Sequence, residues 1–293
     1  MFSISEGLQN YLINPIIKRF IGGVFTDNQD PDNGGHECAH FMTFKFRLGI
    51  SFVAIIIYYL IYRSTIKKLQ KELTTEEAKI VTQPSLLELI LGYFSIGLFI
   101  INCIYKMNSG QLIFIMNPCH MISLVEGYLL ISPNGLTQRT VYTVLMNTLF
   151  SPWIALFFPV TAGLDAPFEV PLFWIEHFNC ALISPLVLSM AHRYYNKSTI
   201  SLRNHLFSHI LFGAYQRVVL FPLSQLSHVN LNFTLCGASV DPFLSFFGRW
   251  YYIVSDFYIF AGGEVFHRLV KIILSLFKKI EAFIMGHTHG KGE

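Results

Sequence analysis

Long apolar segments alternate with short polar stretches along this chain, and their lengths predict its fold. A helix needs about twenty predominantly apolar residues to cross the hydrocarbon core of a bilayer. Segments of about that length occur at residues 44–62, 86–105, 111–131, 141–159, 172–191, 205–223 and 251–269. We therefore predict an all-α, polytopic membrane helical bundle with about seven transmembrane helices.

The last of these segments is the least regular. Asp256, Glu264 and His267 interrupt its apolar character, and Gly262-Gly263 lies near its middle. Residues 270–277 either extend this helix or form a separate interfacial helix. The expected organisation is a luminal tail over residues 1–43, a single transmembrane domain over 44–269 and a cytosolic tail over 270–293.

Composition supports a membrane protein and argues against a nucleic-acid partner. Of the 293 residues, 53% are hydrophobic and 13% are charged, whereas soluble domains carry about 25% charged residues. The net charge is only +3, and the basic residues are scattered among apolar segments rather than gathered in the patch that nucleic acid requires. The sequence leaves the oligomeric state open.

Lysine and arginine residues are distributed unevenly between alternate loops. Most of the 21 fall between the first and second segments, between the fifth and sixth, and after the seventh. The positive-inside rule places these loops in the cytosol. The N-terminus is then luminal and the C-terminus cytosolic, which requires an odd number of spans. We expect a multi-pass protein of an endomembrane.

This orientation sorts the five cysteines by compartment. Cys38 and Cys236 fall on the luminal side, where an oxidising environment permits a disulfide. Two free thiols are the alternative, because sequence does not fix the distance between them. Asn232-Phe233-Thr234 is a candidate luminal glycosylation site at Asn232, whereas Asn196-Lys197-Ser198 is predicted to be cytosolic.

Asn117-Pro118-Cys119-His120 interrupts the third apolar segment and is the first candidate for chemistry. Asn is favoured before a helix and Pro at its first position, so a new half-helix should begin here. Cys119 then lies in the first turn, where free amides and the helix dipole stabilise a thiolate. Those amides, or Asn117, could hold an oxyanion. An inert buried cysteine beside a plain kink is the alternative.

A thiol in apolar surroundings needs a base, and His177 in the fifth segment is the best candidate. At about 1.5 Å per residue, Cys119 lies roughly 14 Å and His177 roughly 8 Å below the luminal ends of their segments, so the two side chains can meet. A histidine that only bonds one helix to another is the alternative.

Other polar residues near this pair are predicted to support it. His120 points about 100° away from Cys119 on the helix, and Ser123 and Glu126 share the face of Cys119. Glu176, Asn179 and Asp256 are candidates to orient the imidazole. Arg217 is a candidate to bind a lipid phosphate, and snorkelling of its side chain to the interface is the alternative. We expect no metal site, because the histidines lack paired ligand spacing.

Four sequence blocks together resemble a known family. The chain resembles the transmembrane protein 164 family of integral-membrane acyltransferases over nearly its whole length, although it matches poorly after Asp256 and differs at Asn102 and Glu176. The blocks are Gly34-Gly35-His36-Glu37-Cys38-Ala39-His40-Phe41; Asn117-Pro118-Cys119-His120; Leu156-Phe157-Phe158-Pro159-Val160 with Pro167-Phe168-Glu169 and Glu176-His177; and Val229-Asn230-Leu231-Asn232 with Leu235-Cys236 and Asp241-Pro242-Phe243.

The resemblance implies a thiol-dependent acyltransferase. We expect it in the endoplasmic reticulum or another endomembrane and expect no cofactor. The resemblance also implies transfer of a polyunsaturated acyl chain from phosphatidylcholine to a lyso ether phospholipid, with Cys119 as nucleophile and His177 as base. The same pair would make a lipid hydrolase if water reached the thioester. A transporter remains an alternative because broken helices also form transport sites, and a seven-span receptor is a further alternative that lacks the expected receptor motifs.

Overall fold

The computed structural model describes residues 15–24, 31–74, 82–161, 164, 166–191, 193–194, 201–239, 241 and 243–289. Within these ranges the chain is all-helical, and the only strand-like pairing is an isolated bridge between Gly34 and Val229. Asn196 and its neighbours, where a cytosolic sequon was predicted, lie outside the described residues.

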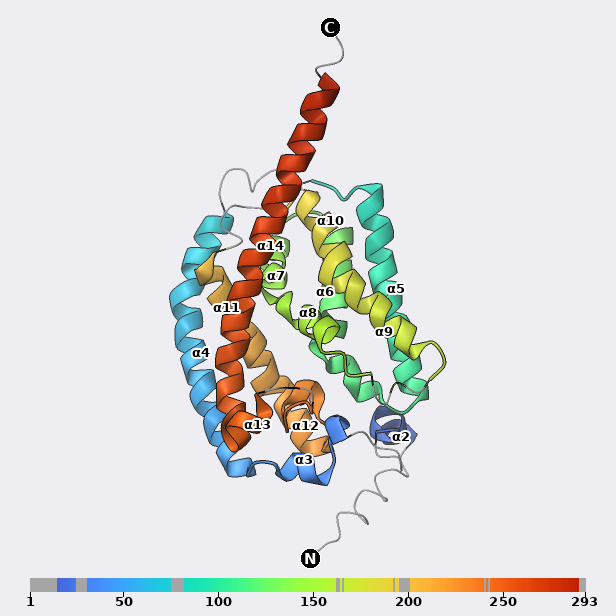
Figure 1. The fold of residues 1–293 in the computed structure, drawn as a ribbon, viewed down its shortest axis with the longest axis vertical. Helices are drawn as coiled ribbons and strands as arrows, with labels where there is room; N and C mark the ends of the chain where they lie inside the picture. Colours follow the sequence, from blue (N-terminus) through green and yellow to red (C-terminus); the bar gives the residue numbers. More distant parts are fainter. Residues whose placement is uncertain are drawn as a thin grey trace, which may run out of the picture.

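The helices follow the apolar segments of the sequence (Figure 1). The first half of the chain forms α2 (Pro15–Ile21), η1 (Pro31–Asn33), α3 (His36–His40), α4 (Phe44–Leu73), α5 (Leu86–Asn108), η3 (Leu112–Met116), α6 (Pro118–Ile131), α7 (Leu136–Thr148) and α8 (Phe150–Phe157). The second half forms α9 (Glu169–Phe178), η4 (Asn179–Ile183), α10 (Ser184–Met190), α11 (Leu202–Tyr215), η5 (Gln216–Leu220), α12 (Phe221–Ser227), η6 (Leu231–Phe233), α13 (Leu244–Phe247), η7 (Gly248–Trp250) and α14 (Tyr251–His289).

Five helical stretches within the described residues are long and apolar enough to cross a membrane, so this is a multi-pass membrane protein. They are Phe44–Lys71, Leu86–Asn108, Leu136–Phe157, Glu169–Met190 and Leu202–Ser227. The predicted count of seven differs at the third and last segments. The third divides into a short 3-10 helix and the 14-residue α6, with the break at Asn117-Pro118 that the sequence predicts.

The predicted last segment belongs to a longer helix than expected. α14 has 39 residues and continues past 269, where the sequence analysis placed the start of a tail. No proline occurs between Tyr251 and His289 to end the helix, and Gly262-Gly263 is accommodated within it. In Figure 1, α14 runs the length of the bundle and its end lies opposite α2, which fits an odd number of spans.

Two of the spanning stretches contain a π-helical turn that ends two residues before a proline. η4 precedes Pro185 and η5 precedes Pro222. Proline has no N–H for the usual helical hydrogen bond, so the preceding turn widens while the helix continues. His177 and Gln216, which belong to these two stretches, both line the interior cavity described below.

The position of α6 is fixed by its close approach to α5. Gly92 and Gly127 face each other across this contact. A Cβ atom added at Gly127 would lie 2.7 Å from Ile96 Cγ1 and 3.1 Å from the Gly92 carbonyl oxygen. Small residues that let two backbones approach are the usual basis of helix packing in membranes. This contact holds the helix that carries Cys119.

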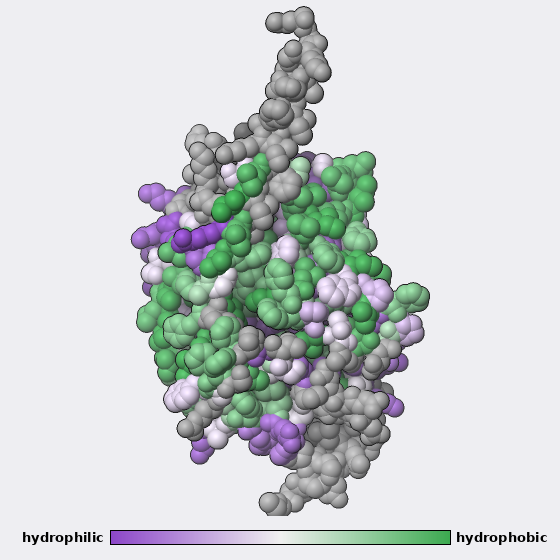
Figure 2. Space-filling view, viewed as in Figure 1, coloured by the Kyte–Doolittle hydropathy of each residue, from purple (hydrophilic) through white to green (hydrophobic). Residues whose placement is uncertain are grey.

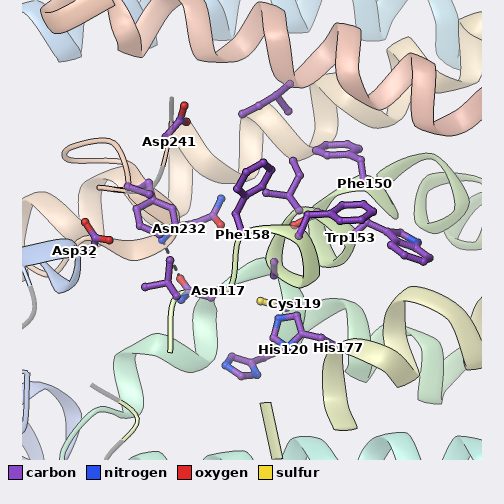
Figure 3. Close-up of a pocket in the computed structure, with 18 of the residues that line it drawn as sticks. Asp32, Asn117, Cys119, His120, Phe150, Trp153, Phe158, His177, Asn232 and Asp241 are labelled. Atoms are coloured by element: carbon purple, nitrogen blue, oxygen red, sulfur yellow. Dashed lines mark hydrogen bonds between the residues drawn. The ribbon is translucent and has the colours of Figure 1, made fainter. Parts of the chain in front are cut away.

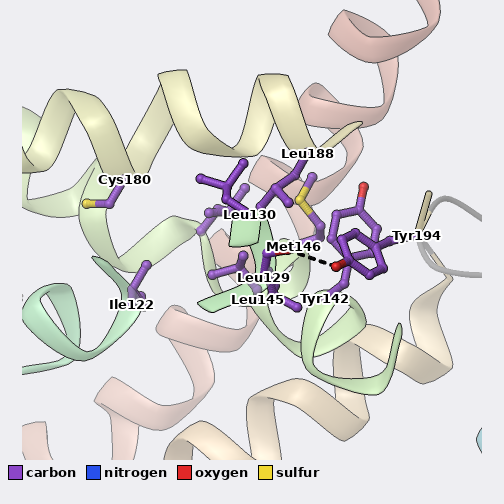
Figure 4. Close-up of a cluster of buried hydrophobic side chains, with 10 residues drawn as sticks. Ile122, Leu129, Leu130, Tyr142, Leu145, Met146, Cys180, Leu188 and Tyr194 are labelled. Carbon is purple, nitrogen blue, oxygen red and sulfur yellow. Dashed lines mark hydrogen bonds between the residues drawn. The ribbon is translucent and has the colours of Figure 1, made fainter. Parts of the chain in front are cut away.

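The other end of α6 packs in a hydrophobic core with α7 and α10 (Figure 4). Polar groups complete this end. The Arg193 guanidinium donates to the carbonyl oxygens of Ser132, at 2.6 Å, and Leu129, and it forms a buried ion pair with Glu88. The Tyr194 hydroxyl donates to Leu129 O at 2.8 Å. These bonds satisfy carbonyls that the end of a helix leaves without intrahelical partners.

The described surface has the character of a lipid-facing surface. Figure 2 shows apolar residues over most of the described part of one face, with hydrophilic residues gathered toward its ends. Phe52 and Leu60 of α4 are 65% and 61% exposed. Large apolar residues exposed in such numbers are expected where lipid, rather than water, surrounds the helices.

Candidate active site

A cavity of about 720 Å³ lies inside the bundle. Its walls come from α5, α6, α8, α9, α11 and α14, and from the loops around η1 and η6. Pockets that hold small-molecule ligands are of this size. Cys119, His120, Glu176 and His177 all line it.

The cavity has a polar end and an apolar end, with Cys119 between them (Figure 3). Asp32, Asn232 and Asp241 lie toward one end, whereas Phe150 and Trp153 lie toward the other. A site of this kind fits an amphiphilic ligand, because one end offers hydrogen bonds and the other offers only apolar contact.

Cys119 is the second residue of α6. Pro118, the first residue, has no N–H, and the Cys119 amide belongs to the turn that has no intrahelical acceptor. The partial positive charge of this helix end therefore lies beside the Cys119 sulfur. In Figure 3 the sulfur and the His177 ring point into the same part of the cavity.

The hydrogen bond of His177 fixes which ring nitrogen can act as a base. Nδ1 lies 2.7 Å from the carbonyl oxygen of Phe173, one turn earlier in α9. A carbonyl oxygen only accepts hydrogen bonds, so Nδ1 carries the proton and Nε2 has the free lone pair in the neutral ring. Nε2 is buried and has no hydrogen-bond partner among the described residues. This is the arrangement that a general base requires.

Asn117 is held by the loop around η6 and not by its own helix. Its side chain makes no capping bond to α6; instead, Oδ1 accepts a hydrogen bond from the backbone N–H of Asn232 at 3.0 Å. Because a backbone N–H can only donate, Oδ1 must face Asn232, and the Nδ2 group remains as a donor. Asn117 lines the cavity, so this donor belongs to the site.

His120 and Glu176 form a second polar group. His120 Nδ1 and Glu176 Oε1 are 2.8 Å apart, and Asn102 Nδ2 donates to Glu176 Oε2 at 3.0 Å. Glu176 has no exposed surface, so both partners compensate for the loss of water around its carboxylate. The predicted role of Glu176 as the orienter of His177 is therefore replaced by a contact with His120.

A buried lysine, Lys106, lies in the cavity wall. Lys106 Nζ is 3.6 Å from Glu169 Oε1 and 5.6 Å from the centre of the Phe114 ring. Both charged side chains line the cavity and are almost fully buried. This pair joins α5 to the beginning of α9, the helix that carries His177.

The polar end is closed by two segments that a disulfide joins. Cys38 and Cys236 form this bond across 198 residues. Beside it, Asn230 Nδ2 donates to the carbonyl oxygens of Asp32 and Cys236, and the Asp32 carboxylate accepts two bonds from Ser239 at 2.8 Å. We call residues 31–41 and 228–241 the luminal cap, following the predicted orientation.

Two predicted supporting residues lie outside the cavity. Ser123 and Glu126 have no exposed surface and are absent from its lining. The cavity meets only the first turn of α6. Positions four and seven residues later lie deeper, where α5 and α10 cover the helix. Their predicted contribution to the site is therefore incorrect.

Arg217 is also placed away from the cavity lining. Its guanidinium forms an ion pair with Asp256 and lies 3.9 Å above the Tyr252 ring. These partners satisfy its charge inside the protein, so the predicted phosphate contact is not supported. Asp256 is correspondingly a partner of Arg217 and not of His177.

Asn232 lies on the cavity wall and is only partly exposed. A glycan on this side chain would extend from the cavity lining, an unusual place for a modification that occurs at surface loops. Glycosylation of Asn232 stays a prediction.

Four residues of the site were not predicted as partners: Asn102, Lys106, Glu169 and the Phe173 carbonyl. The first three are polar residues in or beside apolar segments, a signal that marks function by default. A backbone acceptor such as Phe173 O has no signal in the sequence. Among the described residues, no group of three or more His, Cys, Asp or Glu side chains is arranged to hold a metal ion.

Together these observations define a multi-pass helical membrane protein whose bundle encloses a cavity with a polar end and an apolar end, lined by a cysteine and two histidines. The TMEM164 family model matches residues 37–262, which include most of the cap, the break before Cys119 and most of the cavity wall. This chain belongs to the TMEM164 family.

A curated relative gives the same result. A protein of Dictyostelium discoideum called "Transmembrane protein 164 homolog" is 31% identical over 193 residues, which cover 65% of this chain and 68% of the relative. No solved structure matches the chain significantly.

Proposed function

We propose that this protein is a membrane-embedded phospholipid acyltransferase that uses Cys119 as nucleophile and His177 as base. The observation that carries the proposal is the free Nε2 atom of His177. This atom is buried and carries no proton in the neutral ring, and His177 lines the same cavity as Cys119. The resemblance of the sequence to integral-membrane acyltransferases supports the same chemistry.

In the first half-reaction, His177 Nε2 takes the proton of the Cys119 thiol, and the sulfur attacks the ester carbonyl carbon of a donor phospholipid. The negative charge on the carbonyl oxygen is stabilised by the backbone amide of Cys119 and by Asn117 Nδ2. The ester C–O bond then breaks, and the proton on Nε2 passes to the leaving oxygen. A lysophospholipid leaves, and the acyl chain remains on Cys119 as a thioester.

The second half-reaction returns the enzyme to its starting state. The hydroxyl of an acceptor lysolipid gives its proton to His177 Nε2 and attacks the thioester carbonyl. The C–S bond breaks, a new ester forms, and the proton returns to the Cys119 sulfur. Two half-reactions that are joined by a covalent acyl-enzyme intermediate predict ping-pong kinetics. An interior closed by the cap and the bundle favours transfer over hydrolysis because it limits water.

The substrates follow from the resemblance. Phosphatidylcholine is the proposed donor of a polyunsaturated chain, and a lyso ether phospholipid is the proposed acceptor. The proposed location is the endoplasmic reticulum, with the cap in the lumen and the end of α14 in the cytosol. If water replaces the acceptor, the same steps give a lipid hydrolase.

The test uses purified protein in lipid vesicles with labelled donor and a defined lysolipid. Wild-type protein should form labelled product and carry a hydroxylamine-sensitive acyl group. Cys119→Ala should lose both, by about 10³-fold or more, whereas Cys180→Ala should keep both. Cys180 is the matched control because it is buried and does not line the cavity. Full transfer by Cys119→Ala would overturn the proposal, and free fatty acid as the main product would replace transfer with hydrolysis.

A further inference from the structure

The cavity has an apolar wall that the chemistry at Cys119 does not use. It is formed by one face of α14, at Ile259, Gly262 and Phe266, and by Trp153 and Phe157 of α8. This wall offers almost no hydrogen-bonding groups. Whatever lies against it must be apolar.

The same wall reaches the outside of the protein. Four side chains line the cavity and are also exposed. At the end of α8 they are Phe157 (67% exposed) and Phe158 (51%), and on α14 they are Val265 (60%) and Leu269 (51%). Side chains meet both conditions only where a cavity opens, so an opening lies between α8 and α14. Because α8 belongs to the spanning stretch Leu136–Phe157, the opening faces lipid.

Gly262 leaves this opening unobstructed. A Cβ atom added there would find no other atom within 4 Å, and Gly262 is an exposed residue of the cavity lining. Its neighbour Gly263 is different: a Cβ atom there would lie 3.1 Å from Phe150 Cδ1 and 3.0 Å from His205 Cε1. Gly263 therefore allows α14 to pack against α8 and α11, whereas Gly262 faces open space.

We infer that the gap between α8 and α14 is a lateral entrance for one acyl chain of a membrane phospholipid. The chain passes Gly262 and lies along the apolar wall, its ester bond reaches Cys119, and its headgroup occupies the polar end of the cavity. The surrounding hydrocarbon and the apolar-to-polar order of the wall select an amphiphile with a long apolar chain. This inference rests on the proposed function for the reacting ester, but binding of the chain does not require the reaction.

Photolabelling tests the site without relying on activity. Purified protein in vesicles would receive phosphatidylcholine with a diazirine near the end of one acyl chain, followed by peptide mapping. Phe150 lines the cavity and is only 4% exposed, so a lipid reaches it through the cavity. Leu60 on α4 reports contact with bulk lipid. Labelling of both is expected, and labelling of Leu60 without Phe150 would overturn the inference.

A matched pair of variants tests the entrance. Gly262→Phe should reduce labelling of Phe150 about tenfold, which corresponds to about 1.4 kcal/mol of binding free energy, and should leave Leu60 unchanged. Gly49→Phe is the control, because Gly49 is an exposed helical glycine of α4 whose added Cβ also meets nothing within 4 Å. Equal labelling of Phe150 in Gly262→Phe and Gly49→Phe would contradict the entrance.

The two proposals fail in distinguishable ways. Normal labelling of Phe150 with unimpaired transfer by Cys119→Ala would refute the catalytic proposal and leave the lipid site. If Gly262→Phe did not slow the acylation of Cys119 by long-chain donors, the entrance would be refuted and the catalytic proposal would stand. A water-soluble short-chain thioester does not need the entrance, so Gly262→Phe should slow acylation by this donor less than it slows acylation by a long-chain phospholipid.

Discussion

The backbone N–H of Asn232 donates a 3.0 Å hydrogen bond to the side-chain oxygen of Asn117, two residues before Cys119. This bond joins the luminal cap to the helix start that carries the proposed nucleophile. It also decides the orientation of the Asn117 amide, because the oxygen must face the donor. The Nδ2 group is thereby directed away from Asn232 and is available to an oxyanion in the cavity.

Asn117→Asp tests this assignment. The variant keeps an oxygen to accept from Asn232 but replaces the Nδ2 donor with a charged oxygen. We expect kcat to fall about 10²- to 10³-fold, the usual effect of losing one oxyanion donor, with little change in Tm. Asn232→Gly is the control: it keeps the backbone N–H and suits the positive φ of 45° at this position. A wild-type kcat in Asn117→Asp would remove Asn117 from the mechanism.

The disulfide should matter for activity as well as for stability. Asn230 Nδ2 contacts the Cys236 carbonyl and lies two residues before Asn232, so loss of the Cys38–Cys236 bond loosens the support of Asn117. Cys38→Ser should lower the free energy of unfolding by about 2–4 kcal/mol and reduce transfer. Cys103→Ser, a free cysteine outside the cavity lining, is the control. Transfer unaffected by Cys38→Ser would show that the cap does not position the site.

Local signals in the sequence were sufficient to predict the break in the third segment. The order of Asn, Pro and a helical pattern involves only a few adjacent residues, and α6 begins at Pro118 as predicted. The shared cavity of Cys119 and His177 followed from depth along two helices and from the family resemblance. The break and the shared cavity could both be predicted because they depend on where residues lie along the chain, which hydrophobic periodicity and composition indicate.

Rotation and partner choice were harder to predict because they depend on tertiary packing. Ser123 and Glu126 share a helical face with Cys119, yet the cavity meets only the first turn of α6. Glu176 adjoins His177 in sequence, but a one-residue step turns a helix by about 100° and directs the carboxylate to His120. The sequence around Arg217 does not show its partner, because Asp256 is 39 residues away and only the fold brings the two side chains together.

The end of α6 opposite Cys119 gives a prediction for stability. Arg193→Met would leave Glu88 buried without its ion-pair partner, so we expect a loss of about 3–5 kcal/mol, measured as unfolding in detergent. Arg268→Met removes an ion pair to Glu264 from a side chain that is 71% exposed, and should change stability by less than about 1 kcal/mol.

The double variant Arg193→Met/Glu88→Gln separates the two causes of this loss. It removes the unpaired buried charge, and Gln still serves the capping box with Ser85. It should therefore recover part of the stability that Arg193→Met loses. If the double variant were no more stable than the single one, the lost carbonyl contacts of Arg193, and not the charge on Glu88, would account for the effect.

Three histidines in the luminal cap make its stability depend on pH. His36 stacks on His40 with ring centres 4.1 Å apart, and the His40 and His228 rings are 6.4 Å apart. Partial burial lowers the pKa of His228, and repulsion from His40 and His36 lowers this pKa further. The unfolded chain therefore binds a proton more readily than the folded cap does. The stability that neutral His228 provides is complete above the unfolded pKa of about 6.5 and is lost as the pH falls through the lower folded pKa.

His228→Asn checks this prediction. Asn tolerates the left-handed backbone of this position, where φ is 58°, so the variant removes the titrating ring without straining the chain. Between about pH 7.5 and pH 5.5, the Tm of wild-type protein should fall more than that of His228→Asn, by about 1–2 °C. Because the disulfide stays intact under both conditions, the difference reports the charge at His228. Parallel Tm profiles would assign the acid sensitivity of the protein to groups outside this cluster.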